Sequence, residues 1–249
     1  MRVSRDKGSM PMQRHLDWEG CFNVRDLGGL RTVDGGETRS GSLVRADGLN
    51  RLTRNGWATL EDHGIRTVVD LRNEEEIGPD VGPRPKGLTT VHVPMDDTAD
   101  TEFWENVRSD DLDGSPLFFR PFLERKPERC AAAVTAVCRA EPGGVAFHCG
   151  RGRDRTGLLS VSILALVGVV AEEIATDYEL STERVRRLDA ALGENDQGSE
   201  IAEILRRKRT TARALILDLL ESIDVPAHLR AGGLADDDIA ALRARLVVP

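Results

Sequence analysis

The stretch FHCGRGRDRTGLLS, residues 147–160, places one cysteine, three arginines and three glycines within the nine positions Cys149–Gly157. Such a density of charge does not fit a packed core, and the apolar segments on both sides do not fit a surface loop. A cysteine thiolate is a strong nucleophile, and the planar guanidinium of arginine matches two oxygens of a phosphate. The Cys-x5-Arg spacing of Cys149 and Arg155 therefore indicates a loop that binds an oxyanion beside its own nucleophile.

The segments around this loop place it between a strand and a helix. The apolar run VAFH, residues 145–148, predicts a short buried strand, and an apolar helix is expected from about Arg155. An oxyanion held between them would meet backbone N–H groups and the positive end of the helix dipole. Glycines would let the backbone approach it closely, and the same positive field would favour the thiolate of Cys149. The predicted phosphate-binding residues are Gly150, Arg151, Gly152, Arg153, Asp154 and Arg155.

Two other interpretations of this loop are weaker. Cys149 could be a buried structural thiol beside a solvated patch of arginines, but chance rarely produces the full order of strand, His-Cys, glycines, Asp-Arg-Thr-Gly and apolar helix. A nucleotide-binding P-loop requires the pattern GxxxxGK[ST], which the chain lacks. We therefore interpret the loop as one built for covalent phosphoryl transfer through a thiolate.

The loop HCGRGRDRTG also resembles the signature of the protein-tyrosine phosphatase superfamily. It is most similar to the branch of atypical bacterial tyrosine/dual-specificity and phosphoinositide phosphatases, whose loop reads HCxxGKDRTG. The segments NVRDLGGLRTVDGG, LVRADGLNRLT, GIRTVVDLRNEEE and VPAHLRAGGLADDDIAALRARL resemble the same branch, so the resemblance covers most of the chain from about Cys21. Arg153 departs from it, because the family usually has lysine at that position.

The resemblance implies a role for each motif residue. Cys149 would be the nucleophile, and Arg155 would clamp the phosphoryl oxygens. Thr156 would donate its hydroxyl to the thiolate and ease its departure from the phosphocysteine. His148 would either order the loop through a hydrogen bond or be merely packed. Neither a metal nor a cofactor is expected, because loop amides and Arg155 would supply the electrostatic stabilisation.

The general acid has two possible locations, because the Trp-Pro-Asp loop of many relatives is missing. Asp154 is preferred because it adjoins Arg155, and the phosphoinositide-directed myotubularin relatives also carry an aspartate there. On the other interpretation, Asp154 only supports the loop. The acidic segment of residues 95–115 is the second location and is long enough to form a mobile lid. Its candidate acids are Asp96, Asp97 and Asp100.

A further motif of the same branch matches DLRNEEE, residues 70–76. Asp70, Arg72 and Glu75 are the matching positions. These residues either form an ion-pair network at the end of a strand or contact the substrate directly, and the sequence favours neither.

The alternation of apolar β-branched runs with amphipathic segments predicts an α/β fold, with a central, mostly parallel sheet flanked by helices and a helical C-terminal extension. We expect a flexible lead-in over residues 1–17 and a single domain over residues 18–249. The glycines of VDGGET indicate a hairpin turn, GENDQGS a linker, and Asp236 the N-cap of the last helix. Strands are predicted at 42–46, 65–71, 89–94 and 145–148, and helices at 54–63, 117–125, 127–140, 155–170 and 174–192.

The composition limits the location and partners of the chain. A net charge of −8 over 249 residues argues against a nucleic-acid partner, and no apolar run is long enough to span a membrane. The polar N-terminus lacks the apolar region of a signal peptide, so we expect a cytoplasmic protein with reduced cysteines. Cys130 and Cys138 are expected in the core, and the oligomeric state is not predicted.

These observations together predict a metal-independent phosphomonoester hydrolase of the protein-tyrosine or dual-specificity type that forms a phosphocysteine. Its substrate would be a phosphorylated protein or a phosphoinositide. A phosphatase of a small phosphorylated metabolite and a phosphate-binding module without turnover are the alternatives. Three arginines in the loop favour a substrate with more than one negative charge.

Overall fold

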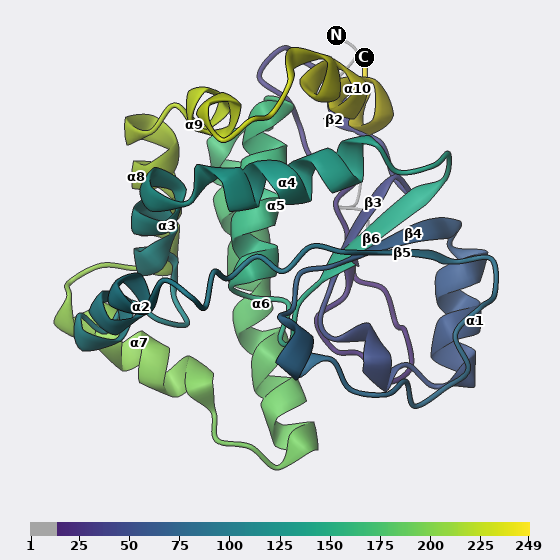
Figure 1. Cartoon of the computed structure of the whole chain (residues 1–249), viewed down its shortest axis with the longest axis horizontal. Helices are drawn as coiled ribbons and strands as arrows, with labels where there is room; N and C mark the ends of the chain where they lie inside the picture. The colour runs from purple at the N-terminus through teal and green to yellow at the C-terminus, as the bar shows by residue number, and fades with distance from the viewer. Residues whose placement is uncertain (1–13) are drawn as a thin grey trace, which may run out of the picture.

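A computed structural model describes residues 14–249; the first thirteen residues of the predicted lead-in lie outside the described residues. Its centre is a five-stranded sheet with the strand order β1-β3-β6-β4-β5. Four of these strands are parallel and β1 pairs antiparallel with β3, so the predicted mostly parallel α/β sheet is confirmed (Figure 1). The strands are β1 Arg25–Asp26, β3 Leu43–Ala46, β4 Ile65–Asp70, β5 Thr89–His92 and β6 Gly144–His148.

The register of the sheet brings three strand ends together. His148, the last residue of β6, pairs with Ala46 of β3 on one side and with Asp70 of β4 on the other. The loop that follows β6 therefore emerges at the carboxyl edge of the sheet, between the segments that follow β3 and β4. Ligands of parallel α/β sheets bind at this edge.

Alternation along the strands divides the apolar side chains between two cores. Val69 and Phe147 belong to the larger core with α4 and α5, whereas their neighbours Val68 and Ala146 belong to a smaller core with Trp57 of α1. Successive side chains of a strand point to opposite faces, so helices cover both sides of the sheet. The helices on and beyond these faces are α1 Arg54–Asp62, α2 Thr101–Ser109, α3 Phe119–Arg125, α4 Pro127–Cys138, α5 Arg155–Leu166 and α6 Ala171–Leu192.

The helical C-terminal extension is confirmed (Figure 1). Its last strand, β7 Val247–Val248, pairs antiparallel with β2 Glu37–Thr38, so the end of the chain is joined to the hairpin region near its start. No helix among residues 14–249 is long and apolar enough to cross a membrane. The extension consists of α7 Gln197–Arg207, α8 Ala212–Ser222, α9 Val225–Ala231 and α10 Asp236–Leu246.

The acidic segment of residues 95–115 is more regular than its composition indicates. It contains α2, for which the Asp100 side chain accepts a hydrogen bond from the Phe103 N–H and caps the first turn. Phe103 and Val107 are four positions apart and both buried, so one face of α2 packs on the core. The sequence analysis overlooked this helix because charged residues surround its short apolar stripe.

Two other boundaries differ from those predicted. α5 ends at Leu166 and not at residue 170, because Gly168 takes a left-handed φ of 80° and Val169 bridges to Thr32. Asp236 is the first residue of α10, and Ala235, with an extended backbone, is its N-cap; the Asp236 carboxylate accepts a hydrogen bond from Arg230.

The described residues of the predicted lead-in are attached to the domain. Arg14 forms an ion pair of 2.7 Å with Asp177 of α6, and His15 bridges to Arg25. Residues 14–17 therefore pack with the domain that was expected to begin at residue 18.

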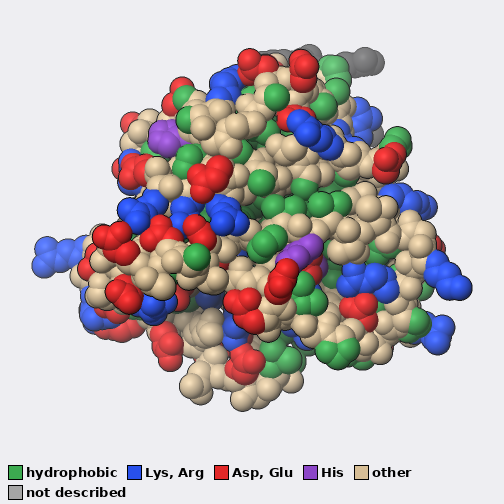
Figure 2. All heavy atoms as spheres, in the orientation of Figure 1, with side chains coloured by type: hydrophobic (Ala, Val, Ile, Leu, Met, Phe, Trp, Pro, Cys, Tyr) green, Lys and Arg blue, Asp and Glu red, His purple; other side chains and the backbone are tan. Residues whose placement is uncertain are grey.

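In the space-filling view, basic and acidic side chains are interleaved across the surface rather than gathered by sign (Figure 2). Some ion pairs of the described residues lie within a single helix, such as Arg206 with Glu203 in α7. Charge on this face is therefore mixed, and the net charge of −8 does not create a single acidic surface there.

Close packing of α5 on α6 depends on Gly157. A Cβ at this position would lie 2.8 Å from Cε2 of Tyr178. We predict that Gly157→Ala lowers the free energy of unfolding by about 1–3 kcal/mol, because the added methyl group overpacks the contact. Urea denaturation measures this change. Gly87→Ala, whose Cβ would have no atom within 4 Å, is the matched control, and equal stability of the two variants would contradict the packing account.

Candidate active site

The carbonyl groups of the loop after β6 point away from its interior. The Gly150 oxygen accepts hydrogen bonds from the Gly48 N–H at 3.0 Å and from Arg51 Nη2 at 3.2 Å. The Arg151 oxygen accepts one from Asn23 Nδ2 at 3.1 Å. Each of these donors lies outside the loop.

The Gly152 carbonyl is held from two directions. Asn23 Nδ2 donates to it at 3.0 Å and Arg45 Nη2 at 2.8 Å. In a trans peptide the C=O and the following N–H point in opposite directions. The N–H groups of residues 151–153 therefore face the interior of the loop, beside the N-terminus of α5. This arrangement is an anion cradle made of backbone amides.

Gly152 is required by this geometry. Its φ of 69° lies in the left-handed region, and a Cβ there would meet the Ala46 carbonyl oxygen at 2.5 Å. An L-residue would have to move the loop away from β3.

The donors that hold the loop are fixed by a buried carboxylate. Asp177 of α6 accepts Arg25 Nε at 3.0 Å and Arg45 Nη1 at 2.9 Å, and Arg14 completes the cluster. Burial alone would raise the pKa of Asp177, but the arginines outweigh it and hold that pKa well below its usual value. Burial, followed by the charge of Arg25, lowers the pKa of Arg45 to about 10, so Arg45 stays cationic at neutral pH.

Cys149 is at the base of the cradle and only 2% exposed. Thr156, at the start of α5, is fully buried, and its Oγ1 has no hydrogen-bond partner within residues 14–249. Its carbonyl, by contrast, accepts a bond from Ser160 Oγ at 2.7 Å. The structure thus leaves a buried hydroxyl available as a donor in the first turn of the helix that follows the cysteine.

His148 is completely buried at the end of β6. Burial lowers its pKa to about 4, so the imidazole is neutral at physiological pH. Its Nδ1 lies 3.1 Å from the Cys149 carbonyl oxygen and its Nε2 lies 3.6 Å from Asp70 Oδ2. The side chain therefore contacts the Cys149 backbone and lies beside the end of the neighbouring strand β4.

Asp70 and Arg72 form a compact network beyond β4. Both oxygens of Asp70 accept bonds from Arg72, the shorter being 2.7 Å to Nη2. Arg72 Nη1 also reaches Asn50 Oδ1 at 2.9 Å. Both residues are buried, and their contacts join the segments that follow β4 and β3. This geometry supports the ion-pair interpretation of the DLRNEEE motif.

Arg155 is held at the mouth of the loop by two carboxylates. Its guanidinium contacts both oxygens of Glu76, with Nη2 2.6 Å from Oε1, and its Nη1 lies 3.1 Å from Asp96 Oδ2. Burial works against the charge of Arg155, but Glu76, Cys149 and Asp96 hold its pKa above the ordinary value. The sequence analysis named Glu75; the structure places its neighbour Glu76 on Arg155 and leaves Glu75 exposed.

Asp96 has a raised pKa, which a proton donor requires. Burial raises its pKa to about 6, and the negative charges of Glu76 and Asp154 act in the same direction against Arg155. Asn73 Nδ2 donates to Asp96 Oδ2 at 3.4 Å. The other candidates of the acidic segment, Asp97 and Asp100, are instead bound to Lys126 at 3.1 Å and 2.8 Å.

The arginine side chains at positions 151 and 153 are engaged by neighbours toward α6 and α7. Arg153 donates through Nε to Asp154 Oδ1 at 3.1 Å and through Nη2 to Gln197 at 3.3 Å. Arg151 Nε donates to Asp189 Oδ1 at 2.9 Å. The loop thus presents these two residues to its interior through their backbone amides, and Arg155 is the arginine whose side chain lies beside Asp96.

A family model described as a tyrosine phosphatase family matches residues 16–248. The chain belongs to this family. It is a cysteine-dependent phosphatase, and the resemblance seen in the loop sequence is confirmed over nearly the whole domain.

The phosphatase is similar to several bacterial proteins. It is 29% identical over 230 residues to the triple specificity protein phosphatase PtpB of Mycobacterium tuberculosis, with 80% of each chain covered. It is 27% identical over 241 residues to a putative tyrosine-protein phosphatase of Cupriavidus necator, with 92% of this chain and 88% of that one covered. A solved structure of P. aeruginosa TpbA with pTyr aligns with a TM-score of 0.37 and 15% identity, over 80% of this chain and 91% of that one.

The side chain of Asn23 is predicted to keep the cradle in shape. Asn23→Ala removes the donor to the Arg151 and Gly152 carbonyls, so the amides behind them lose their fixed direction. We expect kcat/KM for an aryl phosphate to fall about 10- to 100-fold, comparable to the loss of an oxyanion-hole donor, and vanadate inhibition to weaken with it. Steady-state kinetics measures both. Asn55→Ala, on the exposed start of α1, is the control, and an Asn23 variant that matches it would contradict the role of these bonds.

Proposed function

We propose that this phosphatase hydrolyses phosphomonoesters of proteins, phosphotyrosine among them, through a phosphocysteine on Cys149 and without a metal ion. The amide cradle closed by Cys149 at one end and Arg155 at the other supports this proposal most directly. The cradle and the guanidinium supply positive electrostatic potential on several sides of a bound phosphoryl group. A thiolate at its base is in position to attack the phosphorus atom.

The proposed reaction has two steps. In the first, Cys149 Sγ attacks phosphorus, and the bond to the leaving oxygen breaks as that oxygen receives a proton. In the second, water attacks the phosphocysteine and gives a proton to the carboxylate that protonated the leaving oxygen, the S–P bond breaks, and inorganic phosphate leaves. The Thr156 hydroxyl, buried without another partner in the described chain, donates to the departing thiolate. Arg155 binds the equatorial oxygens, with Glu76 orienting its guanidinium.

We propose Asp96 as the general acid. A general acid must carry a proton, and a pKa raised to about 6 lets Asp96 keep its proton at mildly acidic pH, where an ordinary aspartate has lost it. Asp154 is the second candidate, favoured by its place beside Arg155. Its carboxylate accepts two bonds from Arg153, however, which suits a residue that supports the loop.

The substrate class rests on the relatives and on the space beside the loop. The relative from M. tuberculosis is named a triple specificity protein phosphatase. A cavity of about 360 Å³ lies next to Arg153 and Asp154, lined also by Gln197 and Ile201, and we propose that it receives the part of a substrate beyond its phosphate. These observations favour a phosphorylated protein, with a phosphoinositide as a second class, over a small phosphorylated metabolite.

The function is tested by turnover in the presence of a chelator. The substrates to compare are phosphotyrosine and phosphoserine peptides, phosphoinositides and sugar phosphates. Hydrolysis of the phosphotyrosine peptide that persists in the chelator supports the proposal. Loss of activity that a divalent cation restores would contradict the metal-free mechanism, and binding without turnover would identify a phosphate-binding module.

A reducing compartment suits this chemistry, so we propose a cytoplasmic location. All four cysteines are free thiols, and the nucleophile is active only when reduced.

Cys149→Ser is predicted to abolish turnover while retaining oxyanion binding, because the amide cradle and Arg155 remain. Phosphate binding by calorimetry and hydrolysis by phosphate release measure the two properties. Alkylation of the native enzyme is expected at Cys149 before Cys138, because burial raises the pKa of Cys138 to about 12. Cys138→Ala is the control and should keep its activity. Appreciable turnover by Cys149→Ser would exclude covalent thiolate catalysis.

The two candidate acids are separated by leaving-group dependence. If Asp96 is the acid, Asp96→Asn should slow hydrolysis of an alkyl phosphate by about 10²–10⁴-fold and that of an activated aryl phosphate much less. The alkyl reaction of the native enzyme should decline as pH rises through about 6, since Asp96 then loses its proton, and the variant should lack this decline. Asp154→Asn should slow both substrates alike. The reverse pattern would assign the acid role to Asp154.

A further inference from the structure

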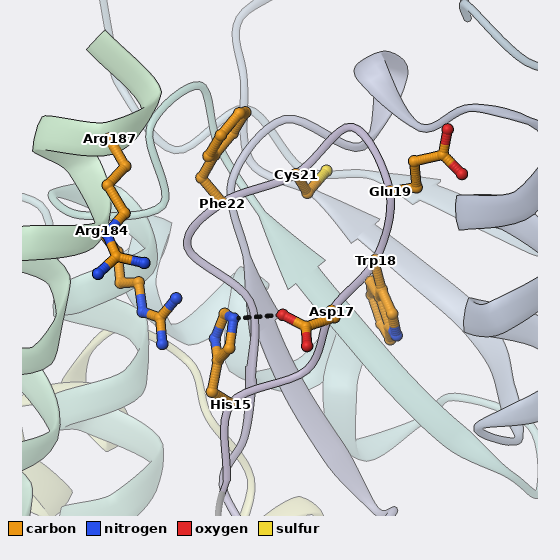
Figure 3. A pocket seen from close by; sticks show the side chains of 8 residues that line it. All are labelled: His15, Asp17, Trp18, Glu19, Cys21, Phe22, Arg184 and Arg187. Carbon is orange, nitrogen blue, oxygen red and sulfur yellow. Dashed lines mark ion pairs between the residues drawn. The ribbon is translucent and has the colours of Figure 1, made fainter. Parts of the chain in front are cut away.

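A second cavity lies on the outer side of α6, where the segment of residues 15–22 passes the helix (Figure 3). Its volume is about 370 Å³. Figure 3 shows Arg184 and Arg187 of α6 on one side, and Phe22 and His15 on the facing segment. The side chains that matter most are His15, Asp17, Phe22, Arg184 and Arg187.

Arg184 is the unusual residue of this cavity. It is half-buried, and it makes no hydrogen bond or ion pair within residues 14–249. Its neighbour Arg187 reaches Glu183 at 3.2 Å, but that carboxylate is shared with Arg186 at 2.7 Å. One carboxylate thus serves two arginines, while the guanidinium of Arg184 has none.

The remaining charges do not neutralise Arg184. Asp17 is 93% exposed and lies 3.0 Å from His15 Nε2, and Glu19 is on the opposite side of the segment in Figure 3. Burial and the charge of Arg187 lower the pKa of Arg184. Burial and the charge of Arg184 likewise lower the pKa of His15, so this imidazole is neutral at physiological pH, and its Nε2 faces the Asp17 carboxylate. The lining contains two arginines and two carboxylates, and among residues 14–249 the guanidinium of Arg184 has no carboxylate within ion-pair distance.

Phe22 gives the cavity an apolar wall. Its ring is half-buried and lies above the space that the two guanidinium groups enter in Figure 3. A planar guanidinium binds two oxygens of a carboxylate or phosphate, and an aromatic ring packs against a flat apolar group. An oxyanion attached to such a group would satisfy both features.

The same segment is attached to the catalytic loop. The N–H groups of Phe22 and Asn23 donate to Asp47 Oδ1 at 3.1 Å and 2.9 Å. Asn23 then holds the loop carbonyls through its side chain. A ligand that contacts Phe22 consequently touches the residue next to the one that holds the cradle.

We propose that this cavity is a second anion site, which binds a phosphate or carboxylate on a flat apolar carrier between Arg184, Arg187 and Phe22. The site is separate from the cradle at Cys149 and does not require the proposed reaction. Its ligand is either an acidic group of the same substrate molecule or an independent anion.

Binding to the whole chain with Cys149→Ser tests the site itself. Phenyl phosphate is titrated while amide resonances are followed by NMR, which also reports the fold of each variant. Two saturable sets of shifts are expected, one in residues 150–155 and one at Phe22 and residues 184–187. Adding Arg184→Gln should weaken the second set about tenfold or more and leave the first, in keeping with the loss of a charge-assisted contact. Arg186→Gln, on the same helix, should leave both.

Unmoved resonances around Arg184, or the same weakening in the Arg186 control, would overturn the proposal. Arg184 would then be an arginine that contacts only solvent. Loss of the set at residues 150–155 alone would count against the proposed reaction and not against this site.

The source of the anion is then decided with the active enzyme. If the substrate supplies it, a phosphotyrosine peptide with a neighbouring glutamate should have a several-fold higher kcat/KM than its glutamine counterpart, and Arg184→Gln should remove that advantage. If an independent molecule supplies it, benzoate should change kcat/KM for the glutamine peptide, and Arg184→Gln should remove that effect. Absence of both effects would overturn any link between this site and catalysis.

Discussion

The loop after β6 depends on the ion pairs that the buried Asp177 carboxylate forms with arginines. This carboxylate gathers three arginines, and one of them, Arg45, extends to the Gly152 carbonyl. Burying such charges is costly, and replacing them by apolar residues would often preserve stability. What apolar residues could not do is hold a backbone carbonyl in a fixed direction. Charge at the centre of the fold thus fixes the direction of the amides that line the cradle.

The three arginines of the loop have different contacts. Arg151 and Arg153 contribute N–H groups to the cradle, while their side chains tie the loop to α6 and α7. Arg155 alone lies with its guanidinium beside Asp96 and Glu76. Because all three arginine side chains are paired with carboxylates, the loop is less suited to several negative charges than its sequence indicates.

The sequence predicted the sheet and the catalytic loop because both depend on local patterns, namely short apolar runs and a fixed spacing of special residues. It did not reveal Asn23 or Asp177, whose importance arises from contacts across more than a hundred positions. The sequence also could not show which of the three glutamates 74–76 contacts Arg155. A single turn of 3₁₀-helix places Glu76 there. The pKa of Asp96 depends on burial and on neighbours from two other segments, which no local pattern encodes.

In the proposed reaction the phosphoryl group is transferred to Sγ of Cys149 before it is transferred to water. The most direct measurement is acid quenching of the native enzyme within its first turnovers of an aryl phosphate, followed by mass spectrometry of the peptide that contains residues 147–160. The account predicts a phosphoryl group on Cys149 that disappears as the substrate is exhausted. A phosphorylated histidine or aspartate, or full turnover with no phosphoryl-enzyme formed at any time, would contradict it.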